Sequence, residues 1–391
     1  MSTSPVVAFI TTWGDRCGIA TYSEELVECL LNSGIKIAVF APNEPSSCQH
    51  ALVQDVAATP LWGRSSPMLA DTLVRATQGA DIVHFQHEHG LFRDRRAFFQ
   101  TLHALRGHGR KTVVTLHTAS EYGEAEACSF FDALRISADV VVTHTPAATA
   151  ALSLARGKAH VVQIPHGTRM LRRYGSREEG LRFLQVPERY WGDVFVGTFG
   201  FIGSGKAIHN TIKCFCDGLA RRFIPPTTRY LICGDPGQGG EDAPYVQELL
   251  GLIGKLGYTD NVFLQCTKFV PRERVRDVMA AFDCAVLNTS SQTLSASGQV
   301  HLHAAHHVPL AVANRPIYHD AVQAGAVPFD VPDDSYKFSL SGVNAISALA
   351  ASKAVRASVK QAMQDFAIRT AWPKVAGLYK TLYGHLTKEQ T

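Results

Sequence analysis

Short runs of apolar residues recur along the first half of the chain, and turn-forming residues follow each run. The first run, Val6–Thr12, leads through the glycine-bearing turn WGDRCG into a helical pattern at Ile19–Ser33, and a second run follows at Gly34–Pro42. A strand, a helix and a strand in this order predict a βαβ unit, and therefore a parallel sheet with a right-handed crossover.

Four further apolar runs continue this series, and each ends in polar residues or histidine. They are Ala80–His87, Lys111–Thr118, Ala138–Thr145 and Ala159–Gly167. Open parallel sheets bind their ligands at the carboxyl ends of the strands. The histidines at these strand ends are therefore candidate binding residues.

The composition changes in a charged, turn-rich segment at Leu171–Asp193, and a second βα series follows it. Its apolar runs are Asp193–Ile202, Thr228–Asp235, Asn261–Val270, Phe282–Ser290 and Val308–Arg315. The C-terminal segment is amphipathic, because its large apolar residues fall largely on one helical face. We therefore expect an α/β protein with Rossmann-like domains at 1–180 and 181–365 and a terminal helix at 366–391. Two doubly wound domains in tandem leave a cleft between facing sheet edges, an arrangement shared by glycosyltransferases, sugar epimerases, phosphorylases and some dehydrogenases.

The bulk composition narrows the class of protein. The chain has 391 residues, which suits two domains, and its 46% hydrophobic and 18% charged residues predict a packed globular protein. A formal net charge of +4, without a run of Lys and Arg, gives no sign of a nucleic-acid-binding face. The nine cysteines are scattered without a CxxC pair, and we expect neither a signal peptide nor a membrane-spanning stretch. We expect a cytoplasmic protein, for which a peripheral membrane contact stays open.

Two glycine-bearing turns are candidate anion sites. Gly14 and Gly18 flank the first turn, where helix N–H groups are free to bind an anion, although an ordinary tight turn explains them equally well. The turn lacks the G-x-G-x-x-G pattern of dinucleotide-binding enzymes, which argues against a dehydrogenase. In the second half, Lys206 is expected to open the helix that follows the strand. Because a helix N-terminus prefers anions, a cation placed there suggests that an anionic ligand binds.

The segment SASGQVHLHAAHHVP forms a third candidate, with a helix predicted to begin near Gly298. Ser297 suits the N-cap position, and Gly298 allows the backbone to approach a ligand closely. His303 and His307 lie four residues apart, as zinc ligands on helices do, but the segment lacks the glutamate of H-E-x-x-H and a third ligand. We therefore predict a diphosphate-binding helix start and no metal site.

Taken in order, these segments resemble a family-four glycosyltransferase. The resemblance covers nearly the whole chain and rests on CGIATYSEEL, DIVHFQHEHGLF, VVTLH, IPHG, GFIGSGK, SASG with LHAAHHVPLAV, and AWPKVAGLYKTLY. It implies the GT-B fold, two Rossmann-like domains about a central cleft, with a C-terminal helix that returns to the N-terminal domain. It also implies a hexosyl- or pentosyltransferase that retains the anomeric configuration.

The sequence departs from the family pattern at three positions. The family usually carries two glutamates eight residues apart, where this chain has Ser295 and His303. Phe201 stands in place of the arginine of the phosphate-contacting segment. These changes leave the identity of the donor open, and with it the activity.

The resemblance implies a role for each candidate residue. His117 would contact the sugar, Lys206 would stabilise the leaving diphosphate, and Glu88 would orient an acceptor hydroxyl or would simply be a solvated loop charge. The remaining candidates would bind the donor, with the base at Phe269 and Val270, the ribose at His303, and the phosphates at Gly18, Ser297, Gly298 and Gln299. The donor would be a UDP- or GDP-linked sugar, and no cofactor or metal is expected.

Three alternatives and the acceptor stay open at this point. A non-catalytic GT-B-like protein that binds a nucleotide or glycan would explain the missing glutamates. A nucleotide-sugar epimerase and a metal-dependent hydrolase that uses the histidines are the others. The acceptor is a lipid-linked sugar, a polysaccharide, a small metabolite, a protein or a modified nucleic acid.

Overall fold

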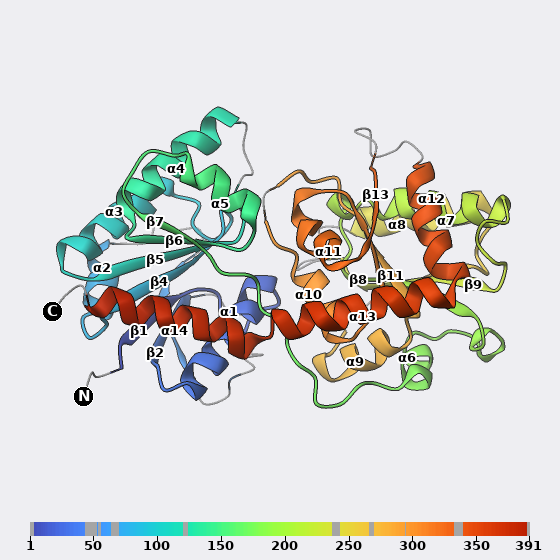
Figure 1. The fold of residues 1–391 in the computed structure, drawn as a ribbon, viewed down its shortest axis with the longest axis horizontal. Coiled ribbons are helices and arrows are strands. Elements are labelled where there is room, and N and C mark those ends of the chain that lie inside the picture. The colour runs from blue at the N-terminus through green and yellow to red at the C-terminus, as the bar shows by residue number, and fades with distance from the viewer. Residues whose placement is uncertain are drawn as a thin grey trace. The chain divides into compact units, whose positions relative to one another are not determined.

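The computed structural model describes residues 4–43, 53, 56–63, 70–119, 124–236, 243–265, 270–293, 295–331 and 339–388. The chain forms two compact units (Figure 1). The N-terminal unit comprises Met1–Gly167, Thr293–Gly298 and Thr370–Thr391, and the C-terminal unit comprises Thr168–Gln292 and Gln299–Arg369. The first division falls at Gly167, just before the charged segment that begins at Leu171.

The N-terminal unit contains a parallel sheet of seven strands in the order β3-β2-β1-β4-β5-β6-β7. The strands are β1 (Val6–Ile10), β2 (Lys36–Pro42), β3 (Ala58–Trp62), β4 (Ile82–His87), β5 (Lys111–Leu116), β6 (Val140–Thr143) and β7 (His160–Gln163). Six of them lie in the apolar runs of the sequence. The edge strand β3 has no such run, because it contains Pro60 and its first four residues are at least partly exposed.

Helices cover both faces of this sheet. They are α1 (Gly18–Asn32), α2 (Ala70–Ala76), α3 (Arg95–Gly107), α4 (Glu124–Ser137), α5 (Pro146–Ser153) and α14 (Trp372–Lys388). The strands sort their side chains by alternation: in β1, Val7 and Phe9 pack with α1 and α14, whereas Ala8 and Ile10 pack with α2 to α5. Helices α1 and α14 lie side by side (Figure 1).

The C-terminal unit contains a parallel sheet of six strands in the order β10-β9-β8-β11-β12-β13. The strands are β8 (Val194–Phe201), β9 (Thr228–Asp235), β10 (Val262–Gln265), β11 (Cys284–Leu287), β12 (Leu310–Ala313) and β13 (Val327–Phe329). Five lie in expected apolar runs. Strand β13 has only three residues, one of which is proline, and so carries too little signal to be predicted.

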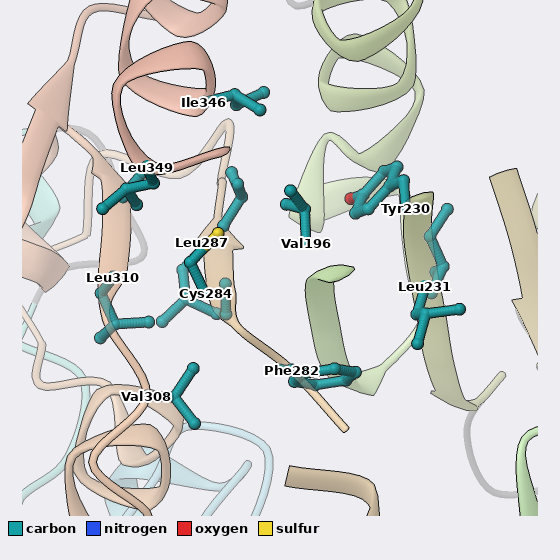
Figure 2. Packing of buried hydrophobic residues seen from close by; sticks show 14 of the residues in the cluster. Val196, Tyr230, Leu231, Phe282, Cys284, Leu287, Val308, Leu310, Ile346 and Leu349 are labelled. Carbon is teal, nitrogen blue, oxygen red and sulfur yellow. The ribbon is translucent and has the colours of Figure 1, made fainter. Parts of the chain in front are cut away.

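A continuous apolar core holds the C-terminal sheet against its helices. The helices are α6 (Arg177–Phe183), α7 (Ile208–Ala220), α8 (Ala243–Leu256), α9 (Arg272–Ala280), α10 (Gly298–Ala305), α11 (His319–Ala324), α12 (Leu340–Ala351) and α13 (Lys353–Arg369). Short 3₁₀ turns are η1 (Glu188–Tyr190), η2 (Ser204–Lys206) and η4 (Pro316–Tyr318). Figure 2 shows Leu287 of β11 and Leu310 of β12 beside Ile346 and Leu349 of α12, all of them buried.

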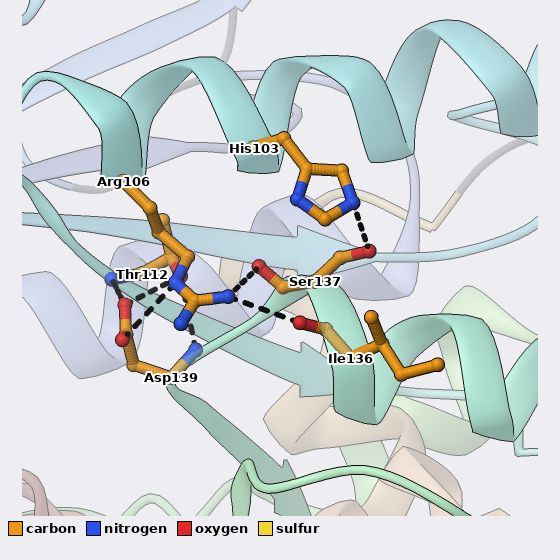
Figure 3. A network of polar contacts seen from close by, with 6 residues as sticks. All are labelled: His103, Arg106, Thr112, Ile136, Ser137 and Asp139. Carbon is orange, nitrogen blue, oxygen red and sulfur yellow. Dashed lines mark hydrogen bonds and ion pairs between the residues drawn. The ribbon is translucent and has the colours of Figure 1, made fainter.

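At the amino ends of β5 and β6, charged groups have a structural role. Arg106 of α3 donates to the carbonyl oxygens of Ile136 and Ser137 at the end of α4 and pairs with Asp139 at 3.3 Å (Figure 3). Asp139 in turn accepts from the backbone N–H and the hydroxyl of Thr112 at 2.8 and 2.9 Å. The arginine therefore caps a helix C-terminus and ties it to two strands.

No helix within the described residues is both long enough and apolar enough to cross a membrane.

Candidate functional site

Each sheet has a switch point, where neighbouring strands send their connections in opposite directions. In the N-terminal unit it lies between β1 and β4, and in the C-terminal unit between β8 and β11. The loops that leave the carboxyl ends of these strands form the crevice in which open α/β sheets bind ligands. Gly18 and Glu88 follow the first pair of strands, and Lys206 and Ser297 follow the second.

A buried glutamate fixes the glycine turn after β1. Gly14 has a left-handed φ of 63°, and its N–H donates to Glu24 Oε1 at 2.8 Å. Cys17 caps α1, with its sulfur accepting from the N–H of Ala20. Gly18 begins the helix, and a Cβ atom there would meet open space. The turn therefore presents the N-terminus of α1 without a side chain in front of Gly18.

In the N-terminal unit, Tyr22 of α1 lies among three histidines and a tryptophan. Its ring centroid is 4.7 Å from that of His117, 5.2 Å from His144, 5.0 Å from His166 and 4.9 Å from Trp372. The three histidines follow β5, β6 and β7, so the strand-end signal in the sequence marks a real cluster. Tyr22 and Trp372 carried no such signal, because helical apolar spacing is typical of ordinary core residues.

Burial keeps the imidazoles of this cluster neutral. It lowers the pKa of His117 well below the usual value, with smaller contributions from His144 and His166, and lowers the pKa of His144 to about 4. The Nδ1–H of His144 donates to the carbonyl of Ile164 at 2.9 Å, which leaves Nε2 as an acceptor. Within the described residues that buried Nε2 has no hydrogen-bond partner. The cluster thus offers neutral donors and acceptors rather than charge.

Glu88 and His117 lie together at the ends of β4 and β5. Glu88 Oε2 accepts from the hydroxyl of Thr118 at 2.9 Å, and Oε1 accepts from the N–H of His89 at 3.1 Å. The Nε2 atom of His117 lies 2.9 Å from Gln86 Oε1. Side chains from the two neighbouring strands therefore hold both candidate groups in place.

The loop before α10 packs against the end of β5, where His117 and Thr118 lie. The hydroxyl of Ser295 donates to the carbonyl oxygen of His117 at 2.5 Å, and Ser295 pairs with Thr118 in an antiparallel bridge. A Cβ atom on Gly298 would lie 3.6 Å from His166 Nε2. Ser295 thus holds the backbone of His117 by donating a hydrogen bond, which an ionised glutamate at this position does not do.

In the C-terminal unit, the turn that carries Lys206 is fastened to the end of β11. The carbonyl of Gly205 accepts from the hydroxyl of Thr289 at 2.9 Å and from the N–H of Ser290 at 3.1 Å. The amide of Asn288 donates to the carbonyl of Ala207 at 3.4 Å. Hydrogen bonds therefore join the loop that follows β8 to the loop that follows β11.

Lys206 does not open α7 as the sequence suggested. It ends the 3₁₀ turn η2, and the helix begins two residues later at Ile208. The reason is the left-handed conformation of Ala207 (φ 46°, ψ 37°), which interrupts the helical backbone. Lys206 is half-buried, and burial lowers its pKa. Within the described residues, no carboxylate lies at ion-pair distance from its ammonium group.

The start of α10 packs against the end of β8. Gly200 has a φ of 132°, a backbone conformation that favours glycine, and the side-chain nitrogen of Gln299 occupies the place where a Cβ atom would lie. His303 is fully buried; its Nδ1 donates to the carbonyl of Gln299 at 2.7 Å, and burial lowers its pKa to about 4. Its Nε2 is a buried acceptor without a partner among the described residues.

The other histidines around α10 point to different partners. His301 lies 2.6 Å from the hydroxyl of Thr168, and His307 lies 3.1 Å from both Tyr174 and Gln364. In the described part of the chain, no three His, Cys, Asp or Glu side chains form a group able to hold a metal ion. Of the base-contacting candidates, Val270 is buried just before α9, and Phe269 lies outside the described residues.

Comparison with known proteins now adds to this geometry. The model of Glycosyltransferase Family 4 matches residues 17–137, which include Gly18, Glu88 and His117. Over these residues the chain is similar to this family of glycosyltransferases. The resemblance seen in the sequence is thereby confirmed for the segment that carries these N-terminal candidates. No curated protein sequence matches the chain.

Solved structures confirm the GT-B fold of the chain. HepE of Anabaena in complex with UDP-glucose has a TM-score of 0.69 at 17% identity, over 97% of this chain and 100% of that one. Sucrose-phosphate synthase of Thermosynechococcus elongatus has a TM-score of 0.71 at 16% identity, over 98% and 100%. A glycosyltransferase of Rickettsia africae has a TM-score of 0.73 at 10% identity, over 99% and 100%.

Proposed function

We propose that the protein transfers a sugar from a nucleoside diphosphate sugar to an acceptor, with retention of the anomeric configuration and without a metal ion. The observation that carries this proposal is Lys206. A half-buried cation without a nearby carboxylate is costly unless an anion binds beside it. The turn that holds Lys206 lies at the switch point of its sheet, where a diphosphate would be expected.

The donor would bind mainly through the C-terminal unit. Lys206 and the free N–H groups of Ser297, Gly298 and Gln299 would stabilise the charge that develops on the leaving diphosphate. His303 Nε2, as an acceptor, would take a hydrogen bond from a ribose hydroxyl, and the backbone at Val270 and Phe269 would contact the base. The solved complexes of HepE with UDP-glucose and with UDP support a UDP-linked donor.

The sugar and the acceptor would contact the N-terminal unit. His117 and His144 are neutral, so they suit hydroxyl groups rather than phosphates. Glu88 accepts hydrogen bonds from Thr118 and His89, and it would orient the acceptor hydroxyl. The N-terminus of α1 at Gly18 would complete the binding of the phosphates.

The first experiment measures transfer from a panel of UDP- and GDP-linked sugars by wild type and by Lys206→Ala. We expect the variant to lose at least about a hundredfold in kcat, because a preorganised charge on the leaving group is removed. Lys255→Ala, which removes an exposed lysine at the end of α8, is the matched control and should retain full turnover.

Two further readouts separate the alternatives. The anomeric configuration of the product, measured by NMR, tests retention, and an inverted product would contradict it. Near-full turnover by Lys206→Ala would refute the diphosphate assignment. Thermal stabilisation by a nucleotide sugar without any turnover would favour a non-catalytic binding protein, and inhibition by chelators would contradict metal-independent transfer.

A further inference from the structure

Polar side chains line the face of the N-terminal sheet that α14 covers. His84 and Gln86 alternate along β4, and Thr115 and His117 alternate along β5 and its end, so all four share one face. His84, Gln86 and Thr115 are fully buried. Central parallel strands normally carry apolar residues on both faces, so this polar line needs an explanation.

Hydrogen bonds join this line into a relay between His117 and the C-terminal helix. His117 Nε2 lies 2.9 Å from Gln86 Oε1, and Gln86 Nε2 lies 3.2 Å from His84 Nε2. His84 Nε2 lies 2.7 Å from the hydroxyl of Thr115, and His84 Nδ1 lies 2.7 Å from that of Tyr383.

The relay continues to α1 through a second tyrosine. The hydroxyl of Thr115 lies 3.1 Å from that of Tyr379, which lies 2.8 Å from that of Tyr22. Tyr22 in turn contacts the ring of His117 edge-on. The polar chain thus begins and ends at the candidate site, and α14 supplies two of its hydroxyl groups.

The donors and acceptors of the relay have one consistent direction. The amide nitrogen of Gln86 only donates, so His84 Nε2 accepts and His84 carries its proton on Nδ1, which donates to Tyr383. The amide oxygen of Gln86 only accepts, so His117 carries its proton on Nε2. The hydroxyl of Thr115 donates to the same Nε2 atom and shares its single lone pair with Gln86. The hydroxyls of Tyr22 and Tyr379 then donate in sequence toward Thr115.

We propose that Tyr383 of α14, acting through His84 and Gln86, is a positioning residue that holds His117 in its Nε2–H tautomer. The Nδ1 lone pair of His117 is then kept free to accept a hydrogen bond from a sugar hydroxyl. This inference rests on the proposed function only in what His117 contacts; the tautomer itself is a property of the protein alone.

Reversing the relay is unfavourable because each link is buried. If His84 moved its proton to Nε2, Gln86 would have to turn its amide and Thr115 would have to reverse its hydroxyl. His84 also remains neutral, since burial lowers its pKa to about 3. Tyr383 provides the acceptor that makes the Nδ1–H form the favoured one.

The test compares two buried tyrosines that each lose only a hydroxyl group. Tyr383→Phe removes the acceptor of His84 Nδ1–H, and the buried N–H left without a partner should drive the His84 proton to Nε2. Tyr230→Phe is the matched control, because Tyr230 is equally buried and bonds the hydroxyl of Thr198 at 2.8 Å in the C-terminal unit. Thr115→Ser and Thr115→Val form a second pair, in which only the serine keeps a hydroxyl next to His84.

Nitrogen-15 NMR of histidine-labelled protein reads the tautomer directly, with the His117 signals identified by their loss in His117→Gln. Wild type, Tyr230→Phe and Thr115→Ser should show His117 protonated at Nε2. Tyr383→Phe should move the proton to Nδ1, and Thr115→Val should give a mixture of tautomers. The kcat of sugar transfer should fall about tenfold or more in Tyr383→Phe, as expected when a histidine presents the wrong nitrogen.

The outcomes separate the relay from the proposed function. A wild-type His117 protonated at Nδ1, or a tautomer unchanged in both Tyr383→Phe and Thr115→Val, would overturn the relay even if sugar transfer is observed. The expected tautomer shifts without transfer from any donor would uphold the relay and refute the proposed function.

Discussion

The two units have the same kind of parallel sheet, yet they present different chemistry at its carboxyl edge. The N-terminal unit gathers neutral imidazoles around Tyr22, whereas the C-terminal unit presents Lys206, a cation without a carboxylate beside it among the described residues. Neutral donors and acceptors suit the hydroxyl groups of a sugar, and a cation suits a diphosphate. The same kind of sheet therefore presents chemically distinct groups in the two units.

The largest expected effect is a difference in acid stability between the units. Burial lowers the pKa of His84, His87 and His166 to about 3 and of His144 to about 4 in the N-terminal unit. In the described part of the C-terminal unit it lowers the pKa of His303 and His306 to about 4. A histidine with a depressed pKa contributes stability above pH 6.5 and loses it as the pH falls toward the folded-state value. The loss is about 1.4 kcal/mol per pH unit for each histidine.

This difference can be measured with fluorotryptophan-labelled protein unfolded in urea at pH 7 and pH 5. Trp13 and Trp372 report the N-terminal unit, and Trp191 reports the C-terminal unit. When the pH is lowered from 7 to 5, the urea midpoint reported by Trp13 and Trp372 should fall further than the one reported by Trp191. Measurements at pH 7 and pH 8 should give similar midpoints. Equal losses in both units would contradict the comparison.

A smaller but more local effect is expected from Gly167→Ala. The added Cβ would lie 2.1 Å from the Trp372 ring, which packs against Tyr22 and so has no room to move. We expect a loss of about 2–3 kcal/mol in the free energy of unfolding, measured in urea. Gly90→Ala, where a Cβ meets open space, should change it by less than about 0.5 kcal/mol. A neutral Gly167→Ala would show that Trp372 does not anchor α14.

Ser295→Glu tests whether restoring the usual family residue restores the usual chemistry. In this chain Ser295 donates to the carbonyl of His117, and a carboxylate there would place two acceptors against each other. We expect a loss of about 1–3 kcal/mol in stability and a lower kcat, with Ser295→Ala losing only about 1 kcal/mol. A rise in turnover on Ser295→Glu would show that the serine does not compensate for the missing acid.

The smallest expected effect concerns α14 itself. Gly377 lies on the exposed face of this helix, where Gly377→Ala should stabilise the N-terminal unit by about 0.5–1 kcal/mol. Gly34 has a φ of 87° after α1, so Gly34→Ala should destabilise the same unit. Thermal unfolding should show a higher melting temperature for Gly377→Ala and a lower one for Gly34→Ala. A change in the same direction for both variants would contradict the exposed helical position of Gly377 or the left-handed backbone of Gly34.

Sequence patterns predicted the features that depend on local order. Buried parallel strands appear as apolar runs, and the histidines that end three of them form the cluster around Tyr22. The pattern could not show that Tyr22 meets Tyr379, 357 positions later in the chain, because such a contact depends on the tertiary fold. The backbone of Ala207 was equally hidden, since alanine seldom adopts a left-handed conformation and carries no signal for it.

The place of α14 in the chain has a consequence for how the protein is made. This helix packs on α1 and supplies two hydroxyls to the N-terminal sheet, yet the ribosome synthesises it only after the whole C-terminal unit. The C-terminal unit contains no segment from beyond Arg369, so its core can form first. The earliest part of the chain thus completes its fold last, and until then the polar line of its sheet lacks the cover of α14.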